Sequence, residues 1–398
     1  MIRLFDKLPW LRGLPFLASL YIGVAAFVTA YAMWVQPGSI NNYMIFRWSF
    51  YNLMHGDDLY SLHPAQHDDL YKYSPTFALL MAPIYLLPRF AGLLLWSLVN
   101  TFAPLLAIRK LNISDKAKAF ILLYICFELL GSVQNTQSNG LIAGLMIGTF
   151  AAFERKQVVT AALLVCLGIY IKVFGAAAGI LFLFYDRKPR FLLACAGWGL
   201  PLAALPLPIT GFHTLIDLYK GWLHLMATDP TISMNISLMT LTQSWFGVSV
   251  SDAAFLAPGL VLLLAPLARP IVRQTFAFRL LYLASLLVWV VIFNHKAESP
   301  TYIIAMAGVA IWAITEPPSW LRAALLCFVF ILTGMSYSDA FPSSIRRDWI
   351  GPYRLKALPC ILAWAIMTWQ LLSSRARSLQ PNASPLDSAN SASLRETS

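Results

Sequence analysis

Long apolar runs alternate with short polar connectors along most of this chain. Several of the runs approach the roughly 20 residues that a helix needs to cross the hydrocarbon core of a bilayer. Thirteen runs can be placed, at about 16–36, 75–88, 90–108, 119–133, 139–153, 157–171, 173–185, 190–208, 252–268, 280–293, 301–315, 320–336 and 357–372. The pattern predicts an all-α, polytopic bundle of transmembrane helices.

Composition agrees with a membrane protein and argues against a nucleic-acid-binding one. Of the 398 residues, 59% are hydrophobic and 12% are charged, and the mean hydropathy is +0.66. The charged share is about half that of a typical soluble domain. The net charge of +11 comes from short basic clusters between apolar runs. Such clusters are typical of cytoplasmic loops, so we expect no nucleic-acid partner.

The basic clusters also predict the orientation in the membrane. The connectors at 109–118, 155–156, 187–190 and 269–279 belong on the cytoplasmic side, and so do both termini. Termini on the same side require an even number of crossings. We therefore expect about 12 membrane helices rather than 13, with 75–108 containing a partial or strongly tilted segment.

This topology divides the chain into one membrane domain and a tail. The membrane domain covers 1–374, and a Ser- and Asn-rich stretch at 375–398 is expected to be a disordered cytoplasmic tail. Two large loops, 37–74 and 209–251, fall on the outer side. All six histidines fall on that side as well, at 55, 63, 67, 213, 224 and 295.

The first outer loop is predicted to contain short interfacial helices. Tyr43, Phe46 and Phe50 recur at helical spacing, which is typical of an amphipathic helix lying on a membrane. Gly56 should end this helix, and a second short helix is expected around 67–71.

The same loop contains His63, His67, Asp68 and Asp69 at a superficially metal-like spacing. These residues lack the closed Cys and His set of a zinc site, so a solvated loop is the favoured interpretation. We expect no metal and no other cofactor. No strand–glycine–helix pattern for a nucleotide is present in the sequence.

Polar residues also interrupt the apolar runs farther along the chain. Gln134–Asn139 is an all-polar hexapeptide suited to binding sugar hydroxyls, although an ordinary polar loop is an equal alternative. Glu128 lies about one turn inside the preceding run, where a carboxylate is costly and either has a function or caps a neighbouring helix.

Two basic features stand out on the predicted outer face. Lys172 lies alone between two apolar runs, where it suits a phosphate, with snorkelling to the interface as the alternative. The segment 294–300 combines His295, Lys296 and Glu298, and a helix starting near Pro300 would point backbone N–H groups toward an anion.

The two later outer loops contain further polar and basic residues. An amphipathic stretch is expected at about 215–226 in the loop 209–251. The loop 336–356 contains four cations that are expected to be exposed, where they would bind an anionic lipid or glycan or contact lipid head groups. They are Arg346, Arg347, Arg354 and Lys356.

From about residue 20 to 370 the chain resembles glycosyltransferase family 87, the polyprenol-phosphate-mannose-dependent mannosyltransferases of the GT-C superfamily. Each motif is loose alone, but their order and spacing are fairly specific. The stretches that support the resemblance are Asn42 with Gly56–Tyr60, Tyr73–Phe77, Gln134–Asn139, Lys172–Phe174 and Asn235–Leu238.

The resemblance implies a bundle of GT-C type that transfers a sugar, with inversion, from a lipid-linked donor on the outer membrane face. It also implies a catalytic aspartate about fourteen residues before the glycine matched by Gly56, and Asn42 stands there instead. An amide cannot accept the proton of an acceptor. His295, Glu298 and Asp58 are therefore the candidates to replace the base.

The remaining candidates are substrate-binding residues. They are Lys172, Lys296, Gln134, Asn135, Gln137, Asn139, Tyr60, Tyr73 and Asn235. The expected partners are a polyprenyl-phosphate sugar, with mannose the first candidate, a lipid or glycan acceptor, and membrane lipids. The resemblance also implies the inner membrane of a bacterium and a role in its cell envelope.

Two other classes of function are compatible with the sequence. A transporter or flippase of lipid-linked saccharides would be expected to show internal repeats with broken helices at mid-membrane, and no such repeat is seen. A catalytically inactive scaffold is the third possibility, because of Asn42.

Overall fold

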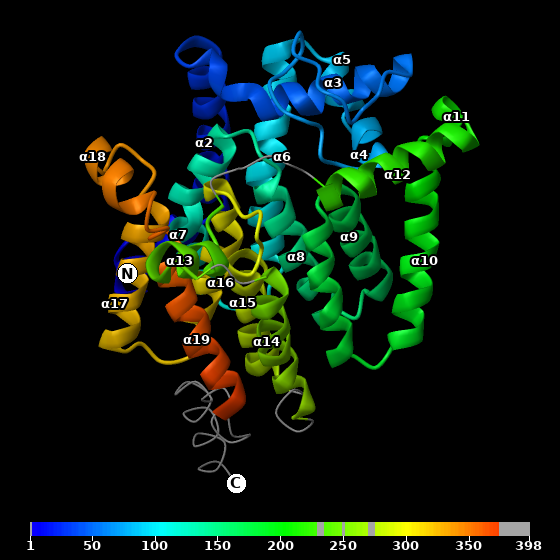
Figure 1. The fold of residues 1–398 in the computed structure, drawn as a ribbon. Coiled ribbons are helices and arrows are strands. Elements are labelled where there is room, and N and C mark those ends of the chain that lie inside the picture. The colour runs from blue at the N-terminus through cyan, green and yellow to red at the C-terminus, as the bar shows by residue number, and fades with distance from the viewer. Residues whose placement is uncertain (1, 229–234, 249–250, 270–274, 374–398) are drawn as a thin grey trace, which may run out of the picture.

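The computed structural model of the protein describes residues 2–228, 235–248, 251–269 and 275–373, and the tail predicted at 375–398 lies outside them. Helices and no strands are present in these residues, as the apolar pattern predicts (Figure 1).

The helices of the first half follow one another closely along the chain. They are α1 (Ile2–Lys7), η1 (Pro9–Arg12), α2 (Leu14–Trp34), η2 (Pro37–Ile40), α3 (Asn41–His55), α4 (Pro75–Leu80), α5 (Ala82–Leu86), α6 (Arg89–Arg109), α7 (Asp115–Gln134), α8 (Asn139–Glu154), α9 (Val158–Ile171), η3 (Val173–Phe184) and α10 (Lys188–Ala204).

The helices of the second half include several short 3-10 and π segments. They are α11 (Leu207–Thr210), α12 (Phe212–Thr228), α13 (Leu238–Phe246), α14 (Asp252–Leu264), η4 (Ala265–Ala268), α15 (Phe276–Ile292), η6 (Ser299–Thr301), α16 (Tyr302–Ala313), α17 (Trp320–Phe328), η7 (Val329–Gly334), α18 (Ser343–Ile345), η8 (Arg346–Ile350) and α19 (Leu358–Ser373).

Several of these helices have the length and apolarity of membrane spans. Within the described residues, four helices are long enough to cross a membrane, Leu14–Trp34, Arg89–Arg109, Asp115–Gln134 and Lys188–Thr210, and further apolar helices are shorter. The protein is an integral membrane protein with a helical fold, and its number of crossings stays a prediction.

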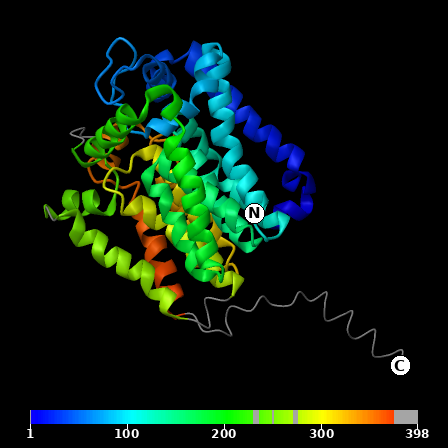
Figure 2. The same ribbon diagram turned by 90° about the vertical axis from the view of Figure 1, so that its right-hand side faces the viewer.

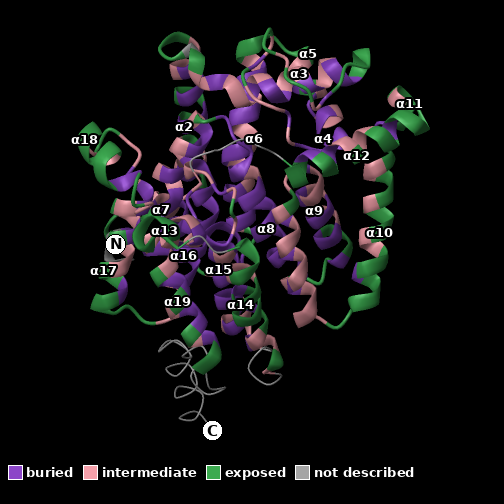
Figure 3. Cartoon of the chain, in the orientation of Figure 1, coloured by how far each residue is buried: buried purple, intermediate pink, exposed green. Residues whose placement is uncertain are grey.

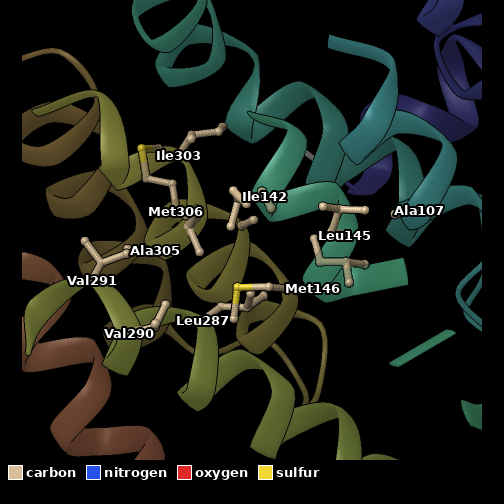
Figure 4. Packing of buried hydrophobic residues seen from close by; sticks show 14 of the residues in the cluster. Ala107, Ile142, Leu145, Met146, Leu287, Val290, Val291, Ile303, Ala305 and Met306 are labelled. Atoms are coloured by element: carbon tan, nitrogen blue, oxygen red, sulfur yellow. The ribbon is translucent and has the colours of Figure 1, made fainter. Parts of the chain in front are cut away.

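Burial is concentrated in the centre of the bundle. Nearly every residue of α8 and α16 is buried, whereas Phe191 is the one residue of α10 that is (Figure 3). Side chains of α8, α15 and α16, such as Met146, Leu287 and Met306, come together in this core (Figure 4). The exposed apolar surface of α10 suits contact with lipid chains.

Glycines let α8 approach α6 at backbone distance. A Cβ atom on Gly140 would lie 2.4 Å from the backbone oxygen of Asn100, and one on Gly144 would lie 2.4 Å from the backbone of Ala103. Small residues four apart are a common means of packing membrane helices closely. This contact fixes the beginning of α8, and therefore the polar hexapeptide before it.

A layer of shorter helices covers one end of the bundle. Helices α3, α4 and α5 lie at that end in both views, opposite the end of α19 (Figures 1 and 2). Helix α3 ends at Gly56, which has φ of +74°, a conformation that glycine adopts without strain. The predicted helix and its end are thus confirmed, whereas its position in the membrane interface stays a prediction. The amphipathic stretch expected at 215–226 is also helical, within α12.

The chain from 67 to 88 is irregular at first and then forms short helices. The prediction of a short helix at 67–71 is wrong, since this segment is irregular. Its backbone is held from outside, because the Asp68 N–H donates to Oδ1 of Asn41 at 2.9 Å. The segment 75–88 forms the short helices α4 and α5, as a partial span would, before the 21-residue helix α6.

Candidate active site

A cavity of about 360 Å³ lies beneath the covering layer. Its walls come from the start of α3, the end of the first outer loop, the turn between α9 and η3, helix α12, and the segment before α16. Its polar and charged lining consists of Asn42, Asp69, Lys72, Tyr73, Gln137, Lys172, Asn294, His295, Lys296, Glu298 and Thr301. Segments far apart in the sequence therefore bring their polar residues to one place.

Lys172 reaches this cavity from a tight turn between two apolar helices. Its N–H donates to the Gly168 carbonyl at 2.8 Å, and its carbonyl accepts from the Gly175 N–H at 2.8 Å. A Cβ on Gly175 would lie 3.0 Å from Cα of Gly168, so the two helices touch through their glycines. The backbone of the turn thus fixes the position from which the Lys172 side chain extends.

Carboxamides hold the ammonium of Lys172. Its Nζ donates to Oδ1 of Asn139 at 2.8 Å and to Oε1 of Gln137 at 3.0 Å. Nζ also lies 5.9 Å from the ring centre of Tyr73 and 5.7 Å from that of Phe174. Neutral oxygens and aromatic faces orient this cation without cancelling its charge.

Glu298 completes the chain of hydrogen bonds. Nε2 of Gln137 donates to Oε2 of Glu298 at 3.1 Å, so Gln137 joins the carboxylate to the lysine. The Glu298 side chain also accepts from the backbone N–H of Thr301 and caps the helical turn that leads into α16. A helix does start near Pro300, as predicted, but the carboxylate itself occupies one of the N–H groups that an anion was expected to bind.

Burial and the Glu298 carboxylate both act on the pKa values of Lys172 and Tyr73. Burial lowers the pKa of Lys172 to about 8, and the Glu298 carboxylate opposes this shift. The lysine is therefore charged at neutral pH but close to titration. Burial, and after it the Glu298 charge, raises the pKa of Tyr73, so its hydroxyl stays protonated.

Asn42 lies in the wall between this cavity and a second one. Its Nδ2 donates to the carbonyl of Asn135 at 2.9 Å. Asn42 lines the first cavity and Asn135 lines the second, which has a volume of about 410 Å³. A carboxylate could not donate this hydrogen bond, so the asparagine has a structural use here.

The structure brings together most of the residues that the sequence singled out. Asn42, His295 and Glu298 line the first cavity, as do the predicted binding residues Lys172, Lys296, Gln137 and Tyr73. Asn139 is joined to them through Lys172.

The other candidates lie elsewhere. Asp58 and Tyr60 line a separate cavity against α12, and Gln134 lies with Asn135 in the second cavity. Asn235 is next to Ile236, whose N–H donates to the carbonyl of Ala297 at 2.7 Å. This bond holds the segment 294–300 in place. The motif at Asn235 therefore contributes to the position of the cavity wall.

Sequence reasoning missed several residues of the cavity. Asp69 and Lys72 line it, and their charged groups lie 3.3 Å apart. Asp69 was considered for a metal but not for the site. Trp222 lines the cavity as well, and so does Asn294, which belongs to the predicted segment 294–300. The sequence offered one signal for Asp69, which is its position as a charged residue between the motifs at Asp58 and Tyr73.

The second cavity contains the partner of Glu128. Nζ of Lys356 lies 2.9 Å and 3.0 Å from the two carboxylate oxygens of Glu128, and both side chains are buried. The prediction that Lys356 is exposed with the arginines of its loop was therefore wrong. The pair joins α7 to the segment before α19.

The chain matches the sequence model of glycosyltransferase family 87 over residues 71–335, more than half its length. The chain belongs to glycosyltransferase family 87. Comparison with curated proteins finds no match. The family segment includes Tyr73, Gln137, Lys172 and Glu298, so most of the polar lining of the cavity belongs to it.

Family membership makes the protein a glycosyltransferase. The matched segment begins at Tyr71, after Asn42 and Asp69. The correspondence of Asn42 with the family's aspartate therefore stays a prediction from the resemblance.

Proposed function

We propose that the protein transfers a hexose, with mannose the first candidate, from a polyprenyl-phosphate donor to a lipid or glycan acceptor. The observation that carries the proposal is the Lys172 ammonium in the cavity, held by carboxamide oxygens. In the described part of the chain, its hydrogen-bond acceptors are those of Gln137 and Asn139. A cation held in this way can still bind a phosphate.

The walls of the cavity suit both ends of a lipid-linked sugar. Trp222, Leu225 and Met226 of α12 form an apolar side, and Val173 is partly exposed beside Lys172. Helix α10, which follows η3 in the chain, also has an exposed apolar surface. An isoprenoid chain can lie along such a surface while its phosphate faces the lysine.

The polar groups supply the chemistry of sugar transfer. A hydroxyl oxygen of the acceptor bonds to the anomeric carbon while the bond from that carbon to the phosphate oxygen breaks. The electron pair remains on the polyprenyl phosphate, where Lys172 stabilises the developing charge. The proton of the hydroxyl passes to a base in the cavity, and Glu298 and His295 are the sequence-derived candidates.

The location of the reaction follows from the predicted topology. The basic connectors at 109–118 and 187–190 favour a topology in which the opposite end of the bundle, with Lys172, lies on the outer face of the membrane. The family resemblance suggests that this membrane is the inner membrane of a bacterium. We expect both termini in the cytoplasm. A cysteine is introduced at Ser61 or at Lys188 in a variant whose five native cysteines are replaced by serine. Its reactivity toward a membrane-impermeant maleimide tests this orientation.

The decisive experiment measures transfer by the purified protein in detergent. Radiolabelled polyprenyl-phosphate mannose is the donor and a membrane lipid extract supplies acceptors. We expect transfer by the wild type and its loss in Lys172→Gln. Lys220→Gln is the matched control, because Lys220 is an exposed lysine paired with Asp217 and lies outside the cavity lining.

Two results would contradict the proposal. Binding of mannosyl and glucosyl carriers without transfer would favour a transporter or an inactive scaffold. Full transfer by Lys172→Gln would exclude this lysine as the phosphate site.

A further inference from the structure

In the part of the chain that the structure describes, the Lys172 ammonium donates its hydrogen bonds to neutral carboxamides, although the Glu298 carboxylate lines the same cavity. We propose that Gln137 and Asn139 are positioning residues that keep this cation from forming an ion pair, so that it remains available to the phosphate of the donor. The proposal rests on the proposed function, and it gives the two carboxamides a role other than binding sugar hydroxyls.

Gln137 lies between the two opposite charges. Its Oε1 accepts a hydrogen bond from Nζ of Lys172 at 3.0 Å, and its Nε2 donates to Oε2 of Glu298 at 3.1 Å. An ammonium only donates and a carboxylate only accepts, so the carboxamide can make both bonds in one orientation alone. Gln137 therefore keeps the ammonium and the carboxylate one carboxamide apart. A side chain without these atoms would let the two charges meet.

Asn139 holds the same lysine at a cost in stability. Its Oδ1 accepts from Nζ of Lys172 at 2.8 Å. The residue is buried, and its Nδ2 has no hydrogen-bond partner among the described residues. A buried N–H group without a partner is destabilising. An aspartate has the same shape, lacks this group and would pair with the ammonium. The asparagine therefore gives up stability, and the charge of Lys172 stays uncancelled.

The backbone before Gln137 is held in an unusual conformation. Thr136 has φ of +49°, in the left-handed region that residues other than glycine rarely adopt. Its Oγ1 accepts from the N–H of Tyr43 at 3.0 Å, and its carbonyl accepts from Nε1 of Trp96 at 2.8 Å. Strained backbone persists where its surroundings hold it. Helices α3 and α6 thus fix the position of Gln137 independently of the lysine.

The isosteric variant Asn139→Asp tests whether a cancelled charge weakens the site. It should raise the Kd for polyprenyl-phosphate mannose about tenfold, because the ammonium pairs with the new carboxylate. Its unfolding temperature in detergent should not fall. Asn135→Asp is the matched control, because Asn135 belongs to the same hexapeptide but is exposed and lines the second cavity. The control should bind the donor as the wild type does.

A double-mutant cycle tests the separation from Glu298. Gln137→Ala should raise the donor Kd about tenfold, because Lys172 can then approach Glu298. Adding Glu298→Gln should tighten binding more in Gln137→Ala than in the wild type, because only there does the carboxylate pair with the lysine. Equal changes in the two backgrounds would overturn the role of Gln137. Gln137→Asn, whose shorter side chain cannot contact both charges, replaces Gln137→Ala if that variant does not fold.

The pH dependence of donor binding is a readout that a merely structural role would not move. Burial lowers the pKa of Lys172 to about 8, and a direct ion pair would raise it. The loss of donor affinity at alkaline pH should therefore begin at a higher pH in Gln137→Ala and in Asn139→Asp than in the wild type. The same onset in all three proteins would overturn the proposal.

Polyprenyl phosphate without a sugar separates this role from the binding of sugar hydroxyls. Gln137→Ala and Asn139→Asp should lose affinity for it by the same factor as for polyprenyl-phosphate mannose. A loss confined to the mannosylated carrier would assign the carboxamides to the sugar and overturn the proposal.

The outcomes also separate this inference from the proposed function. A wild type that binds the donor without transfer would overturn sugar transfer and leave this inference standing, because its readout is binding. A wild type that binds the donor, with an unchanged Kd in Gln137→Ala and Asn139→Asp, would overturn this inference alone.

Discussion

Two lysines, Lys172 and Lys356, each lie at a polar cavity within the helix bundle, but their partners differ. Lys356 contacts both carboxylate oxygens of Glu128, and both side chains are almost fully buried. Lys172 contacts the neutral oxygens of Gln137 and Asn139. The first lysine is neutralised within the protein, whereas the second can bind an external anion. The partner of a lysine inside the bundle therefore distinguishes the structural ion pair from the proposed phosphate site.

The largest effect is expected from breaking the structural ion pair. Glu128→Ala leaves the buried Lys356 ammonium without its carboxylate, which should destabilise the protein by about 3–5 kcal/mol. Thermal unfolding in detergent measures the loss. Asp217→Ala, which breaks the exposed pair with Lys220, should change stability by less than about 1 kcal/mol. Equal effects of the two variants would contradict a structural role for the buried pair.

The next effect concerns binding by the other lysine. Lys172→Gln should weaken binding of polyprenyl-phosphate mannose by about 2 kcal/mol, or roughly thirtyfold in Kd, because it removes a charge-assisted hydrogen bond. Its unfolding temperature should stay near that of the wild type. A large loss of stability with unchanged Kd would reverse the roles assigned to the two lysines.

A smaller effect should appear as pH dependence. Burial lowers the pKa of Lys172 to about 8, so the ammonium is present below this pH and is lost as the pH rises through it. Donor affinity should therefore fall by up to tenfold in the first pH unit above 8, and in total by no more than the roughly thirtyfold loss expected for Lys172→Gln. Lys172→Arg keeps its charge and should show no such fall if it binds the donor. Titrations of donor affinity between pH 7 and about 10 compare the two proteins.

The smallest effect is expected when both members of the structural pair are replaced. Glu128→Leu together with Lys356→Met removes both buried charges, and apolar replacements of similar volume are often neutral in stability. Sugar transfer should persist in this variant, since neither residue lines the first cavity. Loss of transfer with a normal unfolding temperature would show that the second cavity takes part in the reaction.

Features encoded locally could be predicted from the sequence. The apolar runs indicated the helices, and Gly56 indicated the end of α3. Lys172 and the segment 294–300 stood out because charged residues are rare between apolar runs, and the cavity does contain Lys172, His295 and Glu298.

Features that depend on distant contacts could not be predicted in the same way. Glu128 and Lys356 are 228 positions apart, and nothing in either local sequence identifies the other. Asp69 reaches the cavity because the side chain of Asn41 holds the backbone of the following loop. Periodicity describes which face of a helix is apolar, but it contains no information on a bond between a side chain and a distant backbone.

The glycine contact between α9 and η3 has a consequence for the kinetics of binding. Because Gly168 and Gly175 touch, the turn with Lys172 has little freedom to shift before a ligand arrives. A phosphate would therefore meet a preorganised cation, and little conformational entropy would be lost in ordering the protein. A larger residue at Gly175 would therefore change the rate and the affinity of phosphate binding, although it would alter no group that contacts the phosphate.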